Sequence, residues 1–550
     1  MDRSRLIAPT ADGAILAEPP LDRVHDLLSQ NQTSLENWQY DFQGRSAERL
    51  RTMTRAAVLA AATEYTVGGG GTAEGRGPEG HAQTASQSGP PPSALHPPPL
   101  ILTGHQPELF HPGVWIKNFA SHSIARQYGG VSLHLIVDND TVKKTTVRVP
   151  TGTADQPSVV HVPLDRWRGE IPFEEYEVAD ESLFADFGER VVTALEPLGI
   201  RPLVAEFWPL ATEAARRTAH LSERIAAARR TSEAAWGCHN LELPVSRLCQ
   251  TEGFYWFACH LLAQLGRFRD EYNRLLDDYR RRNRIRSHNH PVPSLARDGD
   301  WLEAPFWVWS DRSPRRRQLF VRQQGREMIL TDRDAWTVSL PLAPDREACC
   351  AVDVLADLPR RGVKIRTRAL TTTIFTRLCL TELFIHGLGG ARYDELTDEI
   401  VRRFFGLEPP KFLTLTGTLH LPVRRHRDTG VQPHELERLQ RDLTYNPDRH
   451  LAAQIAHAGE VASLVEAKRH AIASQPGTSG ERRGRFERIR QINEQLGRFV
   501  EASRADAARR MEMIRTDLAA NEILQGRDWA FCAYPADTLR EFFHNRRLGL

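Results

Sequence analysis

Residues 100–140 read LILTGHQPELFHPGVWIKNFASHSIARQYGGVSLHLIVDND, and this stretch decides the fold class. It begins with a short apolar strand, 100–104, that ends in glycine. A helix is expected over 119–128, because Gly129–Gly130 supply the usual stop after a helix. A second apolar strand follows over 131–137. Strand, helix and strand in this order predict one right-handed βαβ unit and therefore a parallel sheet.

Parallel sheets of this kind bind ligands beyond the carboxyl ends of their strands. Backbone N–H groups and the dipole of a helix that begins near Gly113 would form an anion site there. His105 and His111 could donate to phosphoryl oxygens as imidazolium ions or as neutral hydrogen-bond partners. Lys117 and Asn118 could face the same ligand. The alternative is a pair of histidines that cap a helix in a tight turn.

The second strand ends in an acidic turn. Asp138 and Asp140 stand two residues apart, which places both carboxylates on one side of an extended strand. They could bind an amine, a sugar hydroxyl or Mg²⁺. The alternative is a polar turn in which the aspartates cap their own backbone.

A second α/β stretch is expected over 363–422. It contains KIRTRALTTT (364–373) and GLGGARYDE (387–395), in which glycines would let the backbone approach a ligand closely. The loop lacks the GK[ST] ending of a phosphate-binding P-loop, although it would suit an adenosine or a carboxylate. The alternative is a tight loop that needs glycine for its positive φ.

The rest of the chain divides by composition. We expect an N-terminal helical lead-in (1–66), a flexible Gly/Ser/Pro-rich linker (67–99), an α/β core with insertions (100–447), a helical hairpin (448–525) and a C-terminal tail that docks on the core (526–550). Apolar positions at helical spacing on either side of QPGTSG (475–480) predict an antiparallel, coiled-coil-like hairpin. It could pack on the chain's own body or on a second subunit. The aromatic segment DWLEAPFWVWSD (300–311) is expected as a loop.

Composition excludes several classes of protein. The 550 residues are 41% hydrophobic and 26% charged, which is ordinary for a soluble globular chain. No apolar run reaches the roughly 20 residues of a membrane helix, and the first residues lack a secretory pattern, so a cytoplasmic protein without a membrane partner is expected. A net charge of +2 favours no specific nucleic acid.

Seven cysteines form no CxxC pair. Cys238, Cys249 and Cys259 lie near His239 and His260, but their spacing lacks the close ligand pairs of a zinc site. Buried thiols are therefore expected there and at Cys349, Cys350 and Cys379, with no metal site.

The order of these features resembles the bacillithiol-biosynthesis cysteine-adding enzyme family. The similar segments are TGHQPELFHPGVWIKN (103–118), LIVDND (135–140), KIRTRALTTT, GLGGARYDE, KFLTLTGTLHL (411–421) and the predicted hairpin. The chain departs from the family pattern at His105, where the family has glutamine. It also places Arg392 or Tyr393 where the family has glutamate, and it shows no KMSKS-like lysine loop.

The resemblance implies a Rossmann-like core akin to class I synthetases. It also implies an ATP-dependent ligase that attaches an amino acid, cysteine in the family, to an amine-bearing small molecule such as an amino-sugar conjugate. ATP, which Mg²⁺ can accompany, would be the cofactor, and the hairpin could form a homodimer.

In this interpretation, His105, His111 and Lys117 are the catalytic candidates that contact the phosphates. The binding candidates are Thr103, Gly104, Gln106, Gly113, Asn118, Asp138, Asp140, Arg366, Arg368, Gly389, Gly390, Tyr393 and Asp394. The two aspartates would orient the amine or hydroxyls, and the two arginines would hold a carboxylate. A second hypothesis is a non-catalytic scaffold that binds a nucleotide or sugar and assembles through its hairpin. The half-motif His111–Pro112–Gly113, in which Val114 replaces the second histidine of H-x-G-H, favours it.

Overall fold

The computed structural model describes residues 6–68, 97–426, 433–452 and 459–544. It divides into two compact units, which are described separately. The first comprises Met1–Val149, Val160–Pro422 and Arg527–Leu550, and the second comprises Pro150–Val159 and Val423–Gly526. The predicted linker 67–99 lies mostly outside the described residues, as do 427–432, 453–458 and 545–550. The five-part division of the chain stays a prediction.

The first unit is built around a mostly parallel sheet. Within the described residues, this sheet has six strands in the order β1–β14–β13–β2–β3–β6. Their bounds are β1 (Ile15–Glu18), β2 (Leu100–His105), β3 (Val131–Ile136), β6 (Leu241–Pro244), β13 (Leu383–His386) and β14 (Leu413–Gly417). β1 runs antiparallel to β14, and the other neighbouring pairs are parallel. The predicted α/β class with a parallel sheet is confirmed.

The βαβ unit predicted from residues 100–137 lies in the middle of this sheet. β2 leads into α3 (Pro112–Gln127), and β3 returns beside β2 in a register that pairs Leu100 with Val131. The helix begins at Pro112, which agrees with the expected start near Gly113, and it is longer than the predicted range 119–128. Proline suits the first helical position, because its φ is already helical and its missing N–H would have had no partner. Gly129, with a φ of +62°, follows the helix end as predicted.

The strand order changes direction between β2 and β13. From β2 the chain continues to β3 and then to β6 on one side, whereas β13 and β14 lie on the other side. α13 (Leu388–Ile400) and the turn η6 (Val401–Phe405) connect β13 with β14. The carboxyl ends of strands at such a reversal border the crevice where open parallel sheets take ligands. The loop that follows β2 therefore lies where a binding site is expected.

The N-terminal section is more than the predicted helical lead-in, because it also supplies β1. Its helices are η2 (Leu21–Arg23), α1 (Val24–Glu36) and α2 (Ala47–Val67). Arg51 and Arg55 on α2 both pair with buried Glu382, at N–O distances of 2.7 and 2.6 Å. These ion pairs hold α2 against the residues that enter β13.

A mostly helical insertion separates β3 from β6. Its elements are β4 (Thr146–Gly152), β5 (Pro157–Pro163), η3 (Phe173–Glu175), α4 (Glu181–Ala185), α5 (Phe187–Leu195), η4 (Glu196–Leu198), α6 (Val204–Ala214) and α7 (Leu221–Ala235). β4 and β5 form a two-stranded sheet. The helices α6 and α7 are separated by residues 215–220, which leave the helical conformation.

A second sheet follows three helices, α8 (Val245–Leu248), α9 (Glu252–Ala263) and α10 (Leu265–Arg282). Its strands have the order β11–β10–β9–β8–β12, with β7 beside β8. Their bounds are β7 (Arg297–Asp298), β8 (Trp301–Ser310), β9 (Ser313–Gln324), β10 (Glu327–Thr331), β11 (Thr337–Leu340) and β12 (Val363–Thr367). The remaining helices nearby are α11 (Cys349–Asp357), η5 (Leu358–Arg361) and α12 (Ala369–Cys379).

The aromatic segment 300–311 is therefore not a loop, as predicted, but contains strand β8. It pairs with β9 on one side and with β12 on the other, and its Phe306 and Trp309 are buried. Aromatic side chains fit a pleated surface that is buried on at least one face, which explains the strand.

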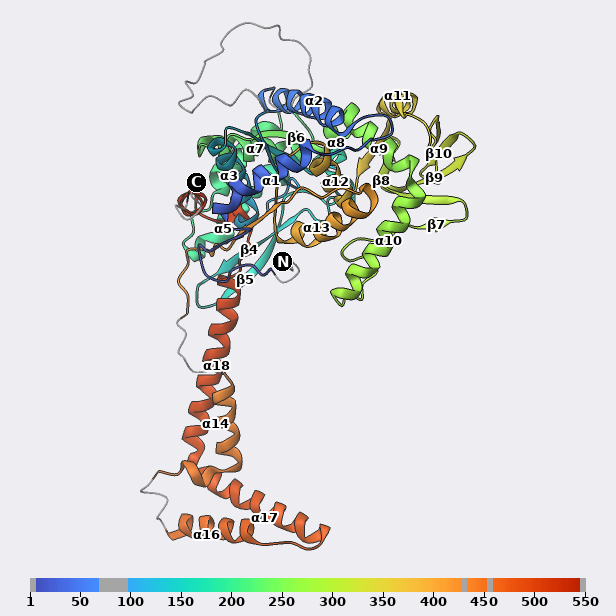
Figure 1. The fold of residues 1–550 in the computed structure, drawn as a ribbon. Helices are drawn as coiled ribbons and strands as arrows, with labels where there is room; N and C mark the ends of the chain where they lie inside the picture. The colour runs from blue at the N-terminus through green and yellow to red at the C-terminus, as the bar shows by residue number, and fades with distance from the viewer. Residues whose placement is uncertain (1–5, 69–96, 427–432, 453–458, 545–550) are drawn as a thin grey trace. The chain divides into compact units, whose positions relative to one another are not determined.

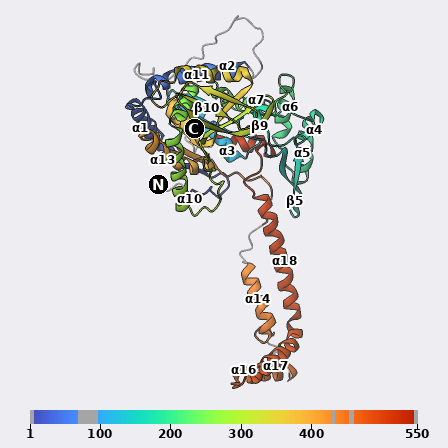
Figure 2. The same ribbon diagram turned by 90° about the vertical axis from the view of Figure 1, so that its right-hand side faces the viewer.

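The second unit consists mainly of helices. They are α14 (Pro433–Tyr445), η7 (Pro447–His450), α16 (Gly459–Ala473), α17 (Ser479–Gly497), η8 (Arg498–Val500) and α18 (Glu501–Leu524). α14 lies beside α18, and α16 lies beside α17 (Figures 1 and 2). The apolar positions that follow QPGTSG (475–480) were predicted to lie on one helix. They are divided between α17 and α18, because the short turn η8 interrupts the helix.

The C-terminal residues 527–544 belong to the first unit and contain η9 (Phe531–Ala533) and α19 (Ala536–Phe543). The backbone N–H of Phe531 donates to the carbonyl of Phe110 at 2.7 Å. The ring of Phe543 stacks on Phe119 of α3 with centroids 4.3 Å apart.

Most of the cysteines are buried as predicted: Cys238, Cys249, Cys259 and Cys379. Cys349 and Cys350 are exposed, which contradicts the prediction, because both stand in the first turn of α11 on the surface. Over residues 6–68, 97–426, 433–452 and 459–544, no helix is both long and apolar enough to cross a membrane.

Candidate functional site

Two cavities lie among the loops that follow β2 and β3. The first, which we call the β2–α3 cavity, has a volume of about 360 Å³ and is bordered by His105, residues 107–111 and the start of α3. The second, which we call the Arg368 cavity, has a volume of about 210 Å³ and is bordered by Gln106, Val137, Asn139, Asp140 and the start of α12. Both cavities lie within the first unit, at the carboxyl edge of its parallel sheet.

The β2–α3 cavity combines cationic and acidic side chains. Lys144 and Arg148 border it together with Glu108 and Asp528. Arg148 pairs with Asp528 at 2.8 Å, whereas Lys144 forms no ion pair within the described part of the chain. Burial raises the pKa of the Glu108 carboxyl, and the charge of Asp140 adds to that effect. The C-terminal tail supplies Asp528 and therefore completes the cavity wall.

The two predicted histidines also border this cavity. Burial lowers the pKa of His105 to about 3 and that of His111 to about 4. Both rings are therefore neutral at pH 7. Of the two roles that the sequence suggested, the imidazolium ion is excluded and the neutral hydrogen-bond partner is left. His105 Nδ1 lies 3.1 Å from the carbonyl of Gln106, whereas His111 Nδ1 is buried with no hydrogen-bond partner among the described residues.

Lys117 and Thr103 point into the protein instead of into either cavity. Lys117 is 4% exposed, and its Nζ donates to the carbonyl of Gly104 at 3.1 Å. Burial lowers its pKa to about 8. Thr103 is fully buried and donates to the carbonyl of Ile385 at 3.2 Å. These two residues hold the end of β2 against α3 and β13.

Gly113 serves packing at the start of α3. A Cβ at this position would overlap the carbonyl oxygen of Gly417 at the end of β14. Any side chain would therefore push the helix away from the sheet. Glycine is required here for close approach of two backbone segments.

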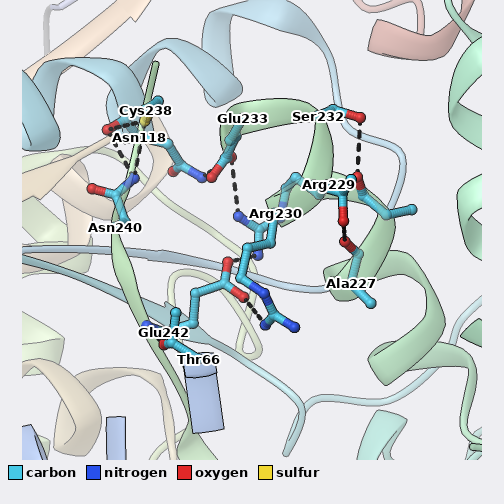
Figure 3. A network of polar contacts seen from close by, with 12 residues as sticks. Thr66, Asn118, Ala227, Arg229, Arg230, Ser232, Glu233, Cys238, Asn240 and Glu242 are labelled. Atoms are coloured by element: carbon cyan, nitrogen blue, oxygen red, sulfur yellow. Dashed lines mark hydrogen bonds and ion pairs between the residues drawn. The ribbon is translucent and has the colours of Figure 1, made fainter. Parts of the chain in front are cut away.

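Asn118 belongs to a buried polar network, shown in Figure 3. Its Nδ2 donates to Glu233 Oε1 at 2.7 Å, and Trp115 Nε1 donates to the same oxygen at 2.6 Å. Arg229 pairs with Glu233 at 3.1 Å and with Glu242 at 2.5 Å. The network links α3, α7 and β6 at a place where nothing is exposed, so the sequence expectation that Asn118 faces a ligand has no support from its contacts.

The Arg368 cavity brings together three predicted residues, Gln106, Asp140 and Arg368. Gln106 Nε2 donates to Asp140 Oδ2 at 3.0 Å, and Arg316 Nη1 pairs with Asp140 Oδ1 at 3.0 Å. Burial opposes the charge of Asp140, but the hydrogen bond from Gln106 and the charge of Arg316 outweigh it and lower the pKa of this carboxyl. Asp140 is therefore an ionised carboxylate at the cavity.

Two arginines lie over one aromatic ring in this cavity. The guanidinium carbon of Arg368 is 4.1 Å from the ring centroid of Trp307, and that of Arg316 is 4.7 Å from it. Arg368 Nη2 also donates to buried Glu303 at 2.7 Å. Such contacts fix both guanidinium groups in position.

Asp138 and Arg366 are separated from Asp140 and Arg368, although each pair was predicted to act together. β3 ends at Ile136, so residues 138–140 form a turn and the two aspartates meet different partners. Asp138 accepts from the backbone N–H of Ser246 at 2.9 Å and from its hydroxyl. Arg366 is 2% exposed and pairs with Glu174 at 3.1 Å. Burial and the charge of Glu174 raise the pKa of Asp138 to about 7.

The predicted glycine loop at 387–395 is the start of helix α13. Gly389 and Gly390 have helical backbone, so neither a ligand-binding loop nor a positive-φ turn is present there. Asp394 is buried, with Arg377 Nη1 at 2.8 Å and His386 Nε2 at 2.7 Å. Tyr393 packs near the ring of His290. Among the residues bordering the two cavities, none of these four is found.

Sequence reasoning missed Trp307, Arg316, Tyr272 and Lys144 as residues of the two cavities. Arg316 stands in the cluster Arg315–Arg316–Arg317, which looks like a solvated surface in the sequence. Its strand pairs with β8, and that pairing brings it to Trp307 and Asp140. If residues 301–310 had been recognised as a strand, their pairing with the strand that carries Arg316 could have indicated that Arg316 lies beside Trp307.

Comparison with known proteins gives no relative: neither a family model nor a curated protein matches the chain. Within the described ranges of the chain, no cluster of three or more His, Cys, Asp or Glu side chains is arranged to hold a metal ion.

Proposed function

We propose that the chain is an ATP-dependent ligase-like enzyme that attaches an amino acid to an amine-bearing small molecule. Cysteine and an amino-sugar conjugate are the substrates that the resemblance of the sequence motifs implies. The observation that carries the proposal is the pair of cavities at the carboxyl edge of the parallel sheet. Gln106 and its neighbour His105 border one cavity each, so two ligands would lie close together.

The strand order supports the finer proposal of a Rossmann-like core. The order β6–β3–β2–β13–β14 begins in the middle, at β2, and reverses beside it, which is the arrangement of doubly wound nucleotide-binding sheets. We also propose that the helices of the second unit act as the predicted coiled-coil-like hairpin and join two copies of the chain. The apolar side chains that α17 and α18 expose, Phe486 and Leu518, support that role.

The β2–α3 cavity suits the nucleotide. Its wall includes the N-terminus of α3, a helix of 16 residues, whose dipole favours phosphate. Lys144 adds a positive charge, and the unpartnered Nδ1 of His111 can hydrogen-bond a polar group of the ligand. Lys117 is not assigned to the phosphates, because its Nζ is held by the carbonyl of Gly104.

ATP, when bound, supplies the group that activates a carboxylate for attack by an amine. The chain's own residues would position the reactants and exclude water. Fixed donors such as the helix N-terminus and the Lys144 ammonium group would stabilise negative charge on the phosphates.

A titration of the chain with ATP tests this assignment. We expect Lys144→Ala to weaken ATP binding about tenfold, the loss of a single charged contact worth about 1.4 kcal/mol. Lys143→Ala is the matched control, because Lys143 is also exposed but does not border the cavity. Equal ATP affinity in the two variants would remove the nucleotide from this cavity.

The second candidate function is a non-catalytic scaffold that binds a nucleotide or sugar. The observation that favours it is the neutral state of His105 and His111 together with the engaged Lys117. All three residues that were predicted to be catalytic thus lack a free positive charge at the cavity. Binding of ATP without its consumption, in the presence of both substrates, would establish this function instead.

A further inference from the structure

We infer that the Arg368 cavity binds a free α-amino acid, with Arg368 contacting the carboxylate and Asn139 and Asp140 contacting the ammonium group. The inference rests on the proposed function in one respect, since it assigns a place to the amino-acid substrate of the proposed ligase. The contacts that support it belong to the cavity itself.

Arg368 provides free hydrogen-bond donors in a buried position. The residue is 9% exposed, and its Nη2 donates a hydrogen bond to Glu303. Nε and Nη1 have no hydrogen-bond partner among the described residues. Leaving buried donors unpaired costs free energy, and a guanidinium group binds carboxylates well. The first residues of α12 border the same space, so the helix N-terminus also favours an anion there.

Asn139 provides the complementary acceptor. Its Nδ2 donates to the carbonyl of Thr367 at 2.8 Å, which fixes the amide and leaves Oδ1 as the free end. Oδ1 is buried and has no partner within the described part of the chain. The ionised carboxylate of Asp140 borders the same cavity. An ammonium group, with three N–H donors, can satisfy both oxygens.

The charge balance selects a zwitterion. Arg316 pairs with Asp140, and Arg368 pairs with Glu303, so the four charged groups sum to zero. A simple acid would meet Arg368 but would place its charge near Asp140 and leave Asn139 Oδ1 unpaired. A simple amine would leave Arg368 unpaired. A molecule that carries both groups adds no net charge to the site. Burial of an uncompensated charge would cost much free energy.

The walls of the cavity leave space for a small side chain. Its volume is about 210 Å³, and Trp307, Tyr272, Val137 and Leu370 supply apolar and aromatic surface. Sites of this kind combine an apolar lining with a few polar groups that orient the ligand. A free amino acid fits this description, whereas a nucleotide is too large.

Calorimetric titration of the full chain with each of the twenty standard α-amino acids, without ATP, tests the inference. We expect at least one to bind. For that amino acid, the analogue without its ammonium group and the analogue without its carboxylate should each bind at least about tenfold more weakly. This comparison uses the unaltered chain, so it does not depend on the folding of a variant. Absence of binding by all twenty, or equal affinity of the analogues, would overturn the inference.

Arg368→Gln should also weaken binding about tenfold or more, whereas Arg317→Gln should not. Arg317 stands on β9, makes an exposed pair with Asp334 and does not border the cavity. A folded Arg368→Gln variant with unchanged affinity would contradict the assignment.

The outcomes separate this inference from the proposed function. Amino-acid binding without ATP consumption would leave the site in place and remove the ligase activity. Conversely, amino-acid-dependent ATP consumption with a KM that Arg368→Gln leaves unchanged would support the ligase and overturn the site.

Discussion

Asp138 and Asp140 are two residues apart, but the pKa values of their carboxyl groups shift in opposite directions. Burial and the nearby charge of Glu174 raise the pKa of Asp138 to about 7. The hydrogen bond from Gln106 and the charge of Arg316 lower that of Asp140 in spite of its burial. Only Asp140 borders the Arg368 cavity. At this scale the site depends on partners that come from distant parts of the chain.

The raised pKa of Asp138 predicts a pH dependence of stability. Its ordinary value is 3.8, so the folded state binds a proton more tightly than the unfolded state does. The resulting stabilisation is complete below pH 3.8 and is lost as the pH rises through about 7. Asp138→Asn, which resembles the protonated form, should therefore gain stability relative to the unaltered chain as the pH rises across this interval.

Urea unfolding at several pH values checks this prediction. Asp345→Asn, a change at an exposed position, serves as the control and should follow the unaltered chain. If the difference between Asp138→Asn and the unaltered chain stays constant with pH, the protonated carboxyl is absent.

The network of Figure 3 predicts a large loss of stability when its carboxylate is removed. Glu233→Ala leaves Trp115 and Asn118 without their acceptor and reduces the partners of Arg229 to Glu242. Removal of one partner from a buried ion pair costs about 3–5 kcal/mol. Chemical denaturation measures this loss. Glu189→Ala, at an exposed position of α5, is the control, and a similar small effect of both changes would show that the network contributes little.

At the scale of elements, two glycines in the first turns of α3 and α13 have different roles. A Cβ at Gly113 would overlap the Gly417 carbonyl, whereas a Cβ at Gly389 would meet nothing within 4 Å. Gly113→Ala should destabilise the chain by at least about 1–3 kcal/mol through overpacking. Gly389→Ala should stabilise it by about 0.5–1 kcal/mol, because alanine loses less backbone freedom in a helix. Thermal unfolding of the two variants compares them, and shifts of the same sign would contradict the packing of α3 against β14.

The elements could be predicted where local pattern and tertiary environment agree. The apolar strands 100–104 and 131–137 and the Gly129–Gly130 stop lie close to β2, β3 and the end of α3. Prediction failed for β8, because a strand with both polar and bulky aromatic residues has no regular alternation. It also failed for α13, because glycines near a helix start look like a loop in the sequence. Strand β1 was missed because its partner, β14, lies far away in the chain.

The site was only partly predictable for the same reason. Position at a strand end correctly indicated that His105, Gln106 and Asp140 lie at cavities. Sequence spacing could not show that Arg368 and Arg366 lie in different places. Arg366 lies in β12 and pairs with Glu174, whereas Arg368 follows β12 and pairs with Glu303 on another segment. Lys117 and Asn118 are polar but buried, and their partners come from Gly104 and α7.

At the scale of the whole molecule, the C-terminal tail returns to the first unit. Phe543 is 1% exposed and stacks on Phe119, and Asp528 borders the β2–α3 cavity. Phe543→Ala should therefore destabilise the first unit by about 3–5 kcal/mol. Val67→Ala at the end of α2 is the control, because Val67 is 81% exposed and its loss should change stability by less than about 0.5 kcal/mol. Equal stability of the two variants in denaturant would show that the tail is not packed.

The measurement that tests the central claim most directly is ATP consumption by the full chain with cysteine and glucosaminyl-malate. The proposal predicts that both substrates together raise consumption, and that Lys144→Ala reduces it about tenfold while Lys143→Ala leaves it unchanged. ATP consumption that neither substrate changes, or that is equal in the two lysine variants, would contradict an ATP-dependent ligase site at the carboxyl edge of the sheet.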